Sequence, residues 1–542
     1  MRTVAILFVP LMTVLAFVGG VAQSESNSEQ EPVQKARGVV FHDQNENGKF
    51  DHGEPTLADI RVSNGRKIVK TDQNGRYELP VDQDTIVFVI KPRQWRTPLS
   101  ENNLPQFYYI HKPDGSPDSK YAGVAPTGPL PESIDFPLYP QDEPEQFQAI
   151  MFGDPQPRNQ EEVDFITHDV IEELVGTDAS FGVTLGDITF DDLSLFEPQA
   201  QAIAVLGIPW YNVIGNHDIN YDARHDRQSD ESFERVFGPA YYSFDYGPVH
   251  FLVLDDIEWI IEGNGRGRYR GGLGEEQMAF IRNDLEMIPD DQLVVLMMHI
   301  PLVKVRDRHE LYRLIEQRPF SMSISAHEHV HRHVYIDSQD GWRGPKPHHH
   351  VVNVTVSGSW WSGAKDERGI PHTQMADGAP NGYSIVTFNG QTYEFEFRAA
   401  GRSAKYQMQI HAPESVGTAQ LAETDVYTNV FNGSPKTKVE MRIRTRPGTA
   451  HGTDCPWQPM TLSAEPDPKY IQVYENEKLL PAKNWRDLPK PKNSTHLWKL
   501  TLPTELEPGL HVIEIRATEA NGRVYQSRRL FRVVRSKATD EK

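Results

Sequence analysis

The sequence predicts an α/β domain set between two domains built mainly from β-strands. Short strand-like runs separated by turn residues fill residues 38–140. Compact apolar runs then alternate with helical patterns over residues 145–400, and strand-like runs return over residues 405–536. Strands that alternate with helices indicate a central sheet that is at least partly parallel, whereas runs of strands alone favour sandwiches. The chain has 542 residues, which is enough for several hydrophobic cores.

The first residues have the pattern of an export signal. Arg2 precedes an apolar run at residues 4–18, and small residues ending at Ala22 follow it. The run is short for a membrane span, so we expect residues 1–22 to be a signal peptide, with a single membrane anchor as the alternative. The protein is therefore expected to be exported, to the periplasm or the extracellular space, with no transmembrane segment after the signal is removed.

The formal net charge of −21 limits the expected partners. An acidic surface repels the phosphates of nucleic acids, so no nucleic-acid-binding patch is expected. An anionic substrate would need a local positive centre, such as bound metal ions. Cys455 is the single cysteine, which excludes a disulfide within the chain.

The N-terminal domain is predicted to be a small β-sandwich. Five short apolar or alternating runs occur between residues 39 and 90, and the dipeptides Asn64-Gly65 and Asn74-Gly75 between them favour hairpin turns.

Residues 43–54 of this domain fit the calcium-loop pattern D-x-[DN]-x-[DN]-G-x₅-E. The candidate ligands are Asp43, Asn45, Asn47, Asp51 and Glu54. No helix is predicted before the loop and Pro55 follows it, so it is not an ordinary helix-loop-helix hand. It is similar to the calcium loops of bacterial surface β-modules. We expect it to bind calcium, and the alternative is a turn held by its own side chains.

In the central domain, polar side chains follow five predicted strands, at residues 149–152, 182–185, 211–214, 293–298 and 322–326. Ligands bind outside the carboxyl ends of strands in an open α/β sheet, so these side chains should meet in one crevice. Mixed oxygen and nitrogen donors suit Mn, Fe or Zn, and seven candidates suit two ions that share a carboxylate. The candidate ligands are Asp154, Gln156, Asp187, Asn216, His299, His327 and His329.

The series Asp-x-Gln, Gly-Asp, Gly-Asn-His-Asp, His and His-x-His resembles the calcineurin-like metallophosphoesterase family over residues 145–335. All five blocks occur in order, each after a predicted strand. The flanking regions are similar to the N- and C-terminal domains of a bacterial exported branch of this family. The resemblance implies a calcineurin-like central domain with a β-sheet core and flanking helices, and a metal-dependent phosphoric ester hydrolase.

The family pattern also implies a role for each ligand in a dinuclear centre. Asp187 would bridge the two ions. The first site would be completed by Asp154, Gln156 and His329, and the second by Asn216, His299 and His327. A hydroxide bridging the ions would be the nucleophile.

His217 is implied as the residue that contacts the phosphate and protonates the leaving oxygen. In the family an acidic residue a few positions after the bridging Asp often orients this histidine. Asp191 and Asp192 are the candidates here, and the spacing does not choose between them.

Gln156 departs from the family, which usually has His at this position. A carboxamide oxygen is a poorer ligand for a transition metal than imidazole. The first site is then expected to be weak, completed by water, or selective for a harder ion.

The leading hypothesis is an exported phosphoesterase that hydrolyses small-molecule or surface phosphate mono- or diesters. The alternative is a non-catalytic cell-surface or carbohydrate-binding protein with a degenerate metallophosphoesterase domain. Gln156 favours the alternative. The intact set of Asp187, Asn216-His217 and His327/His329 favours the enzyme.

Several other residues have less specific patterns. Asp255 and Asp256 end a strand and are expected to cap it or to face solvent. The histidines after the His-x-His block are expected to be packed or solvated: His331, His333, His348, His349 and His350. Trp360 and Trp361 either cap the crevice or belong to the core. Residues 471–474 are expected to form one of the C-terminal strands.

Overall fold

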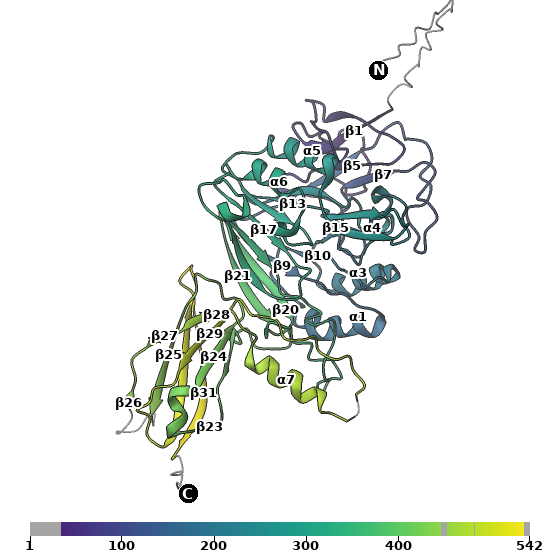
Figure 1. Cartoon of the computed structure of the whole chain (residues 1–542). Helices are drawn as coiled ribbons and strands as arrows, with labels where there is room; N and C mark the ends of the chain where they lie inside the picture. Colours follow the sequence, from purple (N-terminus) through teal and green to yellow (C-terminus); the bar gives the residue numbers. More distant parts are fainter. Residues whose placement is uncertain (1–33, 446–452, 482, 536–542) are drawn as a thin grey trace, which may run out of the picture.

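The computed structural model of the chain describes residues 34–445, 453–481 and 483–535. The predicted signal peptide lies outside them. Figure 1 shows the N-terminal strands at the top, the central domain in the middle and a C-terminal β-structure at the lower left. No helix in these ranges combines the length and the apolar character that crossing a bilayer requires.

The N-terminal part contains two four-stranded sheets. The first has the order β4 (Arg76–Pro80), β1 (Lys35–His42), β8 (Phe136–Pro140) and β6 (Trp95–Arg96). The second has the order β3 (Ile68–Lys70), β2 (Arg61–Ser63), β5 (Thr85–Val89) and β7 (Tyr108–His111). Every residue of β5 is buried, and Phe88 packs edge-on against Phe280 of the central domain, at 5.7 Å between ring centroids. The two parts therefore share one core.

The central domain contains two mixed sheets, where the sequence predicted one central sheet. The five-stranded sheet has the order β11 (Trp210–Val213), β10 (Phe181–Leu185), β9 (Gln146–Phe152), β20 (Gly382–Asn389) and β21 (Thr392–Ala399). The six-stranded sheet has the order β12 (Tyr242–Tyr246), β13 (Val249–Val253), β16 (Leu293–Met297), β17 (Ser321–Ser325), β19 (His348–Val352) and β18 (Arg332–Ile336). Strands β9 to β11 are mutually parallel, as are β13, β16, β17 and β19.

Buried aromatic side chains join the inner faces of the two sheets. Phe181 of the first sheet contacts Phe251 of the second at 5.3 Å between ring centroids, and both belong to the largest hydrophobic core. Apolar runs of this kind show that a strand is buried, but not which strand it pairs with. The second sheet was for this reason not predictable from the pattern alone.

Helices cover the outer faces of both sheets. Helix α1 (Gln160–Ile166) continues through a π-helical segment (Thr167–Ile171) into α2 (Glu172–Leu174). Together with α3 (Phe196–Ala204) it packs on the five-stranded sheet, while α5 (Gly274–Leu285) and α6 (Arg308–Ile315) cover the six-stranded sheet. Two further elements are inserted between these strands along the sequence. Helix α4 (Glu231–Phe237) comes between β11 and β12, and a hairpin of β14 (Ile257–Ile261) and β15 (Gly267–Gly271) comes between β13 and β16.

The C-terminal part contains two further sheets around a core of its own. One has the order β22 (Met408–His411), β24 (Asp425–Val430), β29 (Leu497–Thr501) and β28 (Thr461–Ser463). The other has the order β23 (Ser415–Gly417), β31 (Val524–Val534), β30 (Gly509–Thr518), β25 (Lys438–Thr445) and β26 (Thr453–Asp454), with β27 (Gln458–Pro459) also paired to β25.

The strand expected at residues 471–474 is wrong, because these residues lie in helix α7 (Pro468–Lys478). The Asp467 side chain accepts hydrogen bonds from the backbone N–H groups of Lys469 and Tyr470, at 2.6 and 3.3 Å. Pro468 occupies the first turn, where a missing N–H costs nothing. A run of four residues is too short to distinguish a strand from a helix by its apolar pattern. The Asp467-Pro468 pair before it is the sequence signal that indicates a helix.

Candidate metal centre

The loops after β9, β10, β11, β16 and β17 bring the predicted ligands together at one edge of the two sheets. Nε2 of His299 lies 3.2 Å from Oδ1 of Asp187 and 3.1 Å from Nδ1 of His327. Ligand atoms of these three residues all lie within 4.8 Å of one another. This spacing is compact enough for one cation to contact all three.

His299 is held with one ring nitrogen turned toward this cluster. Its Nδ1–H donates to the backbone oxygen of Leu185 at 2.9 Å, which fixes the tautomer. Its Nε2 then faces Oδ1 of Asn216 at 3.1 Å. His329 is held in the same way, because its Nδ1 lies 2.5 Å from the oxygen of Gly358 and its Nε2 remains for a ligand.

The first predicted site contains a buried acceptor without a partner. Gln156 donates from Nε2 to Oδ2 of Asp187 at 2.7 Å, while its Oε1 is buried and has no hydrogen-bond partner among the described residues. Asp154 is fully buried nearby, and its carboxylate accepts the backbone N–H of His327 at 2.9 Å. A buried acceptor of this kind is costly unless something satisfies it. A cation beside Gln156 and Asp154 fits these residues.

Five of the predicted ligands have left-handed backbone conformations. The φ angles lie between 36° and 70° for Asp154, Gln156, Asp187, His327 and His329. Such angles cost energy for residues other than glycine and are concentrated at functional sites. Here they turn the side chains at the strand ends toward one point.

The electrostatics of the cluster also favour a cation. Burial alone would lower the pKa of His299, but the carboxylates of Asp187, Asp154 and Asp256 outweigh it and raise this pKa to about 10. Burial and the nearby charge of His299 lower the pKa of His327 to about 3. The carboxylates around His299 therefore stabilise positive charge at this place. Metal cations would take the same place.

His217 and Asp191 form a close pair beside the ligands. Nδ1 of His217 lies 2.6 Å from Oδ1 of Asp191, and the backbone N–H of His217 donates to Oδ1 of Asp187 at 2.9 Å. Asp192 instead accepts from the backbone N–H of Ser194 at 3.2 Å and caps the following turn. Of the two candidates that the sequence left open, Asp191 is the one that contacts His217.

Two residues that the sequence did not indicate extend this pair into a stack. The Phe190 ring lies on the His217 ring at 4.3 Å between centroids, and the Arg158 guanidinium lies 3.9 Å from the centroid of Phe190. Arg158 also donates to the backbone oxygen of Trp360 at 3.1 Å. Neither residue belongs to a recognisable spacing, so only the folded loops could reveal them.

Two tyrosines also reach the site from segments without a sequence signal. The Tyr221 hydroxyl donates to the backbone oxygen of Asn216 at 2.6 Å. Tyr269, on the β14–β15 hairpin, meets the His327 ring edge-on at 6.2 Å between centroids.

Trp360 and Trp361 divide the two roles that the sequence left open. The Trp360 ring lies against His329 at 3.9 Å between centroids, so this residue borders the ligand cluster. Trp361 is buried in the core, and its Nε1–H donates to the backbone oxygen of Pro155 at 3.0 Å.

Asp255 and Asp256 cap backbone groups, as expected. Asp256 is fully buried and accepts the N–H groups of His299 and Ile300, each at 3.1 Å, while Asp255 accepts that of Ile257 at 2.9 Å. Asp256 therefore fixes the backbone at His299, one of the predicted ligands.

The later histidines are packed inside the six-stranded sheet or against its neighbours. His348 and His350 are buried and share hydrogen bonds with the hydroxyls of Ser323 and Ser325 at 2.7–3.0 Å. Nδ1 of His333 lies 2.9 Å from Nε2 of His349, and Nε2 of His331 lies 3.2 Å from Oδ1 of Asn432.

The predicted calcium loop is a compact turn on the N-terminal sheet. Asp51 accepts the side-chain amides of Asn45 and Asn47, both at 2.8 Å, and Asp43 accepts the N–H of Gly48 at 2.7 Å. Glu54 accepts the N–H groups of Gln44 and Asp51, both at 2.9 Å. The structure thus brings the five candidates together, and calcium binding stays a prediction.

Comparisons with known proteins agree with this geometry. The family model described as "Calcineurin-like phosphoesterase" matches residues 151–331. Models of the N-terminal and C-terminal parts of calcineurin-like phosphoesterases match residues 44–122 and 350–525.

Individual relatives are more distant. A probable glycerophosphodiester phosphodiesterase, GpdQ, of Arcobacter nitrofigilis is 27% identical over 128 residues, which are 23% of this chain and 42% of the relative. This chain therefore spans less than half of that protein's length. Purple acid phosphatase PPD1 from yellow lupin (Lupinus luteus) seeds has 14% identity and a TM-score of 0.35, over 63% of this chain and 67% of the other. The three family models, in order along the sequence, show that this chain belongs to the calcineurin-like phosphoesterase family.

Proposed function

We propose that this protein is an exported phosphoesterase that hydrolyses phosphate mono- or diesters with two divalent transition ions. The observation that carries the proposal is the convergence of Asp187, His299 and His327, from three different strand ends, on a space that one cation would fill. Family membership supports the same activity. Export is supported by the apolar run after Arg2 and the small residues that end it.

The two ions would share Asp187. Asp154, Gln156 and His329 would hold one ion, and Asn216, His299 and His327 the other. Mixed oxygen and nitrogen donors suit Mn, Fe or Zn. When bound, two such ions stabilise the charge that develops on a transferring phosphoryl group and activate water for attack.

His217 would act as the general acid. Its Nδ1–H is directed at Asp191, so Nε2 is the atom that would give a proton to the leaving oxygen. Burial lowers the pKa of His217, but the carboxylates of Asp187 and Asp191 outweigh it and the pKa is raised. A raised pKa favours the protonated ring, which is the form that a general acid needs. The Phe190 and Arg158 stack would hold its plane toward the substrate.

The test is hydrolysis of 4-nitrophenyl phosphate and bis(4-nitrophenyl) phosphate by purified protein with added Mn²⁺. We expect turnover of at least one ester, and loss of turnover together with bound metal in Asp187→Asn, because one carboxylate then no longer serves both ions. Turnover of neither ester, or an Asp187→Asn variant with normal metal content and activity, would contradict the proposal. Fractionation of expressing cells for this activity tests export.

A further inference from the structure

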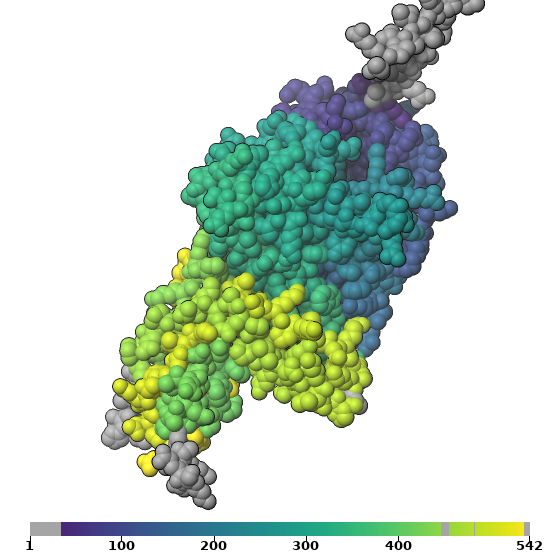
Figure 2. All heavy atoms as spheres, in the orientation of Figure 1, coloured from purple at the N-terminus to yellow at the C-terminus, as the bar shows by residue number. Residues whose placement is uncertain are grey.

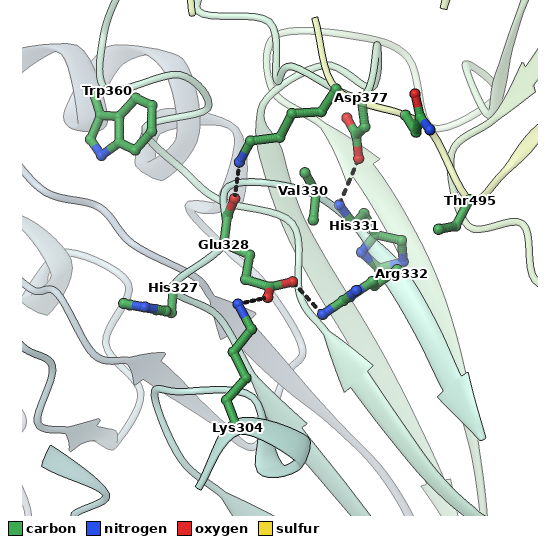
Figure 3. A pocket seen from close by; sticks show the side chains of 11 residues that line it. Lys304, His327, Glu328, Val330, His331, Arg332, Trp360, Asp377 and Thr495 are labelled. Atoms are coloured by element: carbon green, nitrogen blue, oxygen red, sulfur yellow. Dashed lines mark hydrogen bonds and ion pairs between the residues drawn. The ribbon is translucent and has the colours of Figure 1, made fainter. Parts of the chain in front are cut away.

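A pocket of about 410 Å³ opens beside the ligand cluster, with His327 in its wall (Figure 3). Its lining comes from separate parts of the chain. Besides His327, the lining includes Lys304, Glu328, Arg332, Trp360, Asp377 and Lys492. Because His327 is a predicted ligand and Trp360 stacks on another, His329, anything bound in this pocket would be next to the scissile phosphate.

The C-terminal part of the chain supplies one side of this pocket. The segment between α7 and β29 contributes Lys492, Asn493 and Thr495 to the pocket lining, next to residues of the central domain. The backbone N–H of Lys492 donates to the oxygen of Ala376 at 2.9 Å, which fixes this segment on the central domain. Figure 2 shows the yellow-green atoms of the C-terminal part directly against the teal atoms of the central domain.

The pocket has an excess of positive charge. Glu328 is shared between Lys304 and Arg332, with Arg332 Nη2 at 2.5 Å from its Oε2. The second carboxylate in the lining, Asp377, is buried, and Oδ2 accepts the backbone N–H of His331 at 2.9 Å and lies 3.1 Å from Nε2 of His496. Three cationic side chains therefore face one carboxylate that is accessible to the pocket, in a chain with a net charge of −21.

Two cationic side chains in the pocket wall are only partly satisfied by their neighbours. Lys492 is exposed, and its ammonium donates to the backbone oxygen of Glu328 at 3.1 Å but forms no ion pair among the described residues. Nε of Arg332 is buried and has no hydrogen-bond partner within the same ranges. A guanidinium that shares one carboxylate with Lys304, and an ammonium without a carboxylate partner in the same pocket wall, form an arrangement that a carboxylate or phosphate satisfies.

We propose that this pocket binds an anionic group that the substrate carries beyond its scissile phosphate, and that the C-terminal domain sets this specificity through Lys492. The inference rests on the proposed phosphoesterase function. It narrows the expected substrates to phosphate esters that carry a second anionic group in addition to the scissile phosphate. Trp360 would provide an apolar surface for the chain that links the two groups.

The test compares matched esters that differ only in that charge. Phosphate monoesters of ω-hydroxy carboxylic acids with one to four methylene groups are paired with those of the corresponding amides, and kcat/KM is measured with Mn²⁺. For at least one chain length we expect the acid to be preferred by about three- to tenfold, the range for a charge pair that is partly exposed. The preference should fall toward unity in Lys492→Met and persist in Lys492→Arg.

Lys490→Met is the matched control, because Lys490 is an exposed lysine two residues away that does not line the pocket. It should keep the preference. Equal kcat/KM for acid and amide at every chain length would overturn this inference, and so would a preference that survives in Lys492→Met. Turnover of 4-nitrophenyl phosphate by the same samples would show that the phosphoesterase activity itself is intact. Absence of turnover with both 4-nitrophenyl phosphate and bis(4-nitrophenyl) phosphate would overturn the proposed function and this inference with it.

Discussion

Gln156 donates its side-chain N–H to Asp187 across 2.7 Å and leaves its own carbonyl oxygen buried without a hydrogen-bond partner among the described residues. The residue that departs from the family pattern is therefore in contact with the carboxylate predicted to bridge the ions. Its free oxygen is placed to be a ligand, but a neutral oxygen binds transition ions more weakly than imidazole does.

The first prediction follows from this contact. Gln156→His is expected to tighten the weaker metal site and to lower the Mn²⁺ concentration that gives half-maximal activity by about tenfold, the lower end of the effect of changes around a metal site. Gln156→Asn, a shorter amide, is the control and should raise that concentration. Wild-type protein that keeps two ions after dialysis, together with an unchanged titration for Gln156→His, would show that Gln156 does not limit metal binding.

A second prediction separates His217 from the ligands. His217→Ala should keep its metal content and lower kcat by roughly 10²–10⁴-fold, the usual effect of removing a general acid. The loss should be smaller for 4-nitrophenyl phosphate than for an alkyl phosphate, because nitrophenolate leaves without a proton. An equal loss for both esters would argue against the acid role, and metal analysis of the same samples checks the ligands.

Asp191 and Asp192 provide a matched pair for the third prediction. Asp191→Asn removes the charge 2.6 Å from His217 and should lower turnover of alkyl phosphates by about tenfold or more, because the charge that holds the protonated ring is lost. Asp192→Asn changes a neighbouring carboxylate that caps a turn and should leave kcat unchanged. Similar losses in both variants would mean that the effect is structural.

A buried ion network between the N-terminal and central domains gives a prediction on stability. Arg61 contacts Asp245 at 2.6 Å and Asp284 at 2.7 Å, and His250 lies 2.7 Å from Asp245 and 2.9 Å from Asp284. Arg61→Met should lower the free energy of unfolding by about 3–5 kcal/mol, because it leaves buried carboxylates without a partner. Arg66→Met, on an exposed turn of the same domain, is the control and should change it little. Denaturant unfolding measures both.

The same network fixes a pH dependence. Burial lowers the pKa of His250, but Asp284 and Asp245 outweigh it and raise the pKa above 6.5. Its stabilisation is therefore complete below pH 6.5 and is lost as the pH rises through the folded-state pKa. Burial raises the pKa of Asp245 and Asp284, but Arg61 and His250 outweigh it and hold both below 3.8, so their contribution is present above pH 3.8 and is lost in more acidic solution. The difference in unfolding free energy between wild type and His250→Gln should be largest at pH 4–6.5 and should shrink at higher pH.

The last prediction concerns the loop at residues 43–54. Millimolar Ca²⁺ should raise the Tm of the whole protein, since carboxylates gathered on one turn are stabilised by a cation that binds only the folded state. The shift should disappear in Asp43→Asn, because this change removes the carboxylate that accepts the N–H of Gly48 inside the turn. Mg²⁺ is the control ion. Equal shifts with both ions, or none, would favour a turn held by its own hydrogen bonds.

The sequence by itself determined the chemistry of the centre. Asp154, Asp187 and His299 each follow an apolar strand, and a polar residue at the end of a buried strand is placed by the strand that precedes it. Their order along the chain and their donor atoms were sufficient to predict a dinuclear site and the family. These features are local, so a linear sequence contains them.

Only the tertiary structure decided which residues surround that centre. Contacts between segments that are far apart in sequence decide that Asp191 pairs with His217, that Phe190 stacks on the same ring, and that Lys492 of the C-terminal domain lines the pocket. The division of the strands into two sheets is also of this kind. Hydrophobic periodicity reports which face of an element is buried, but the partner of that face is selected by packing over the whole chain, and no local pattern specifies it.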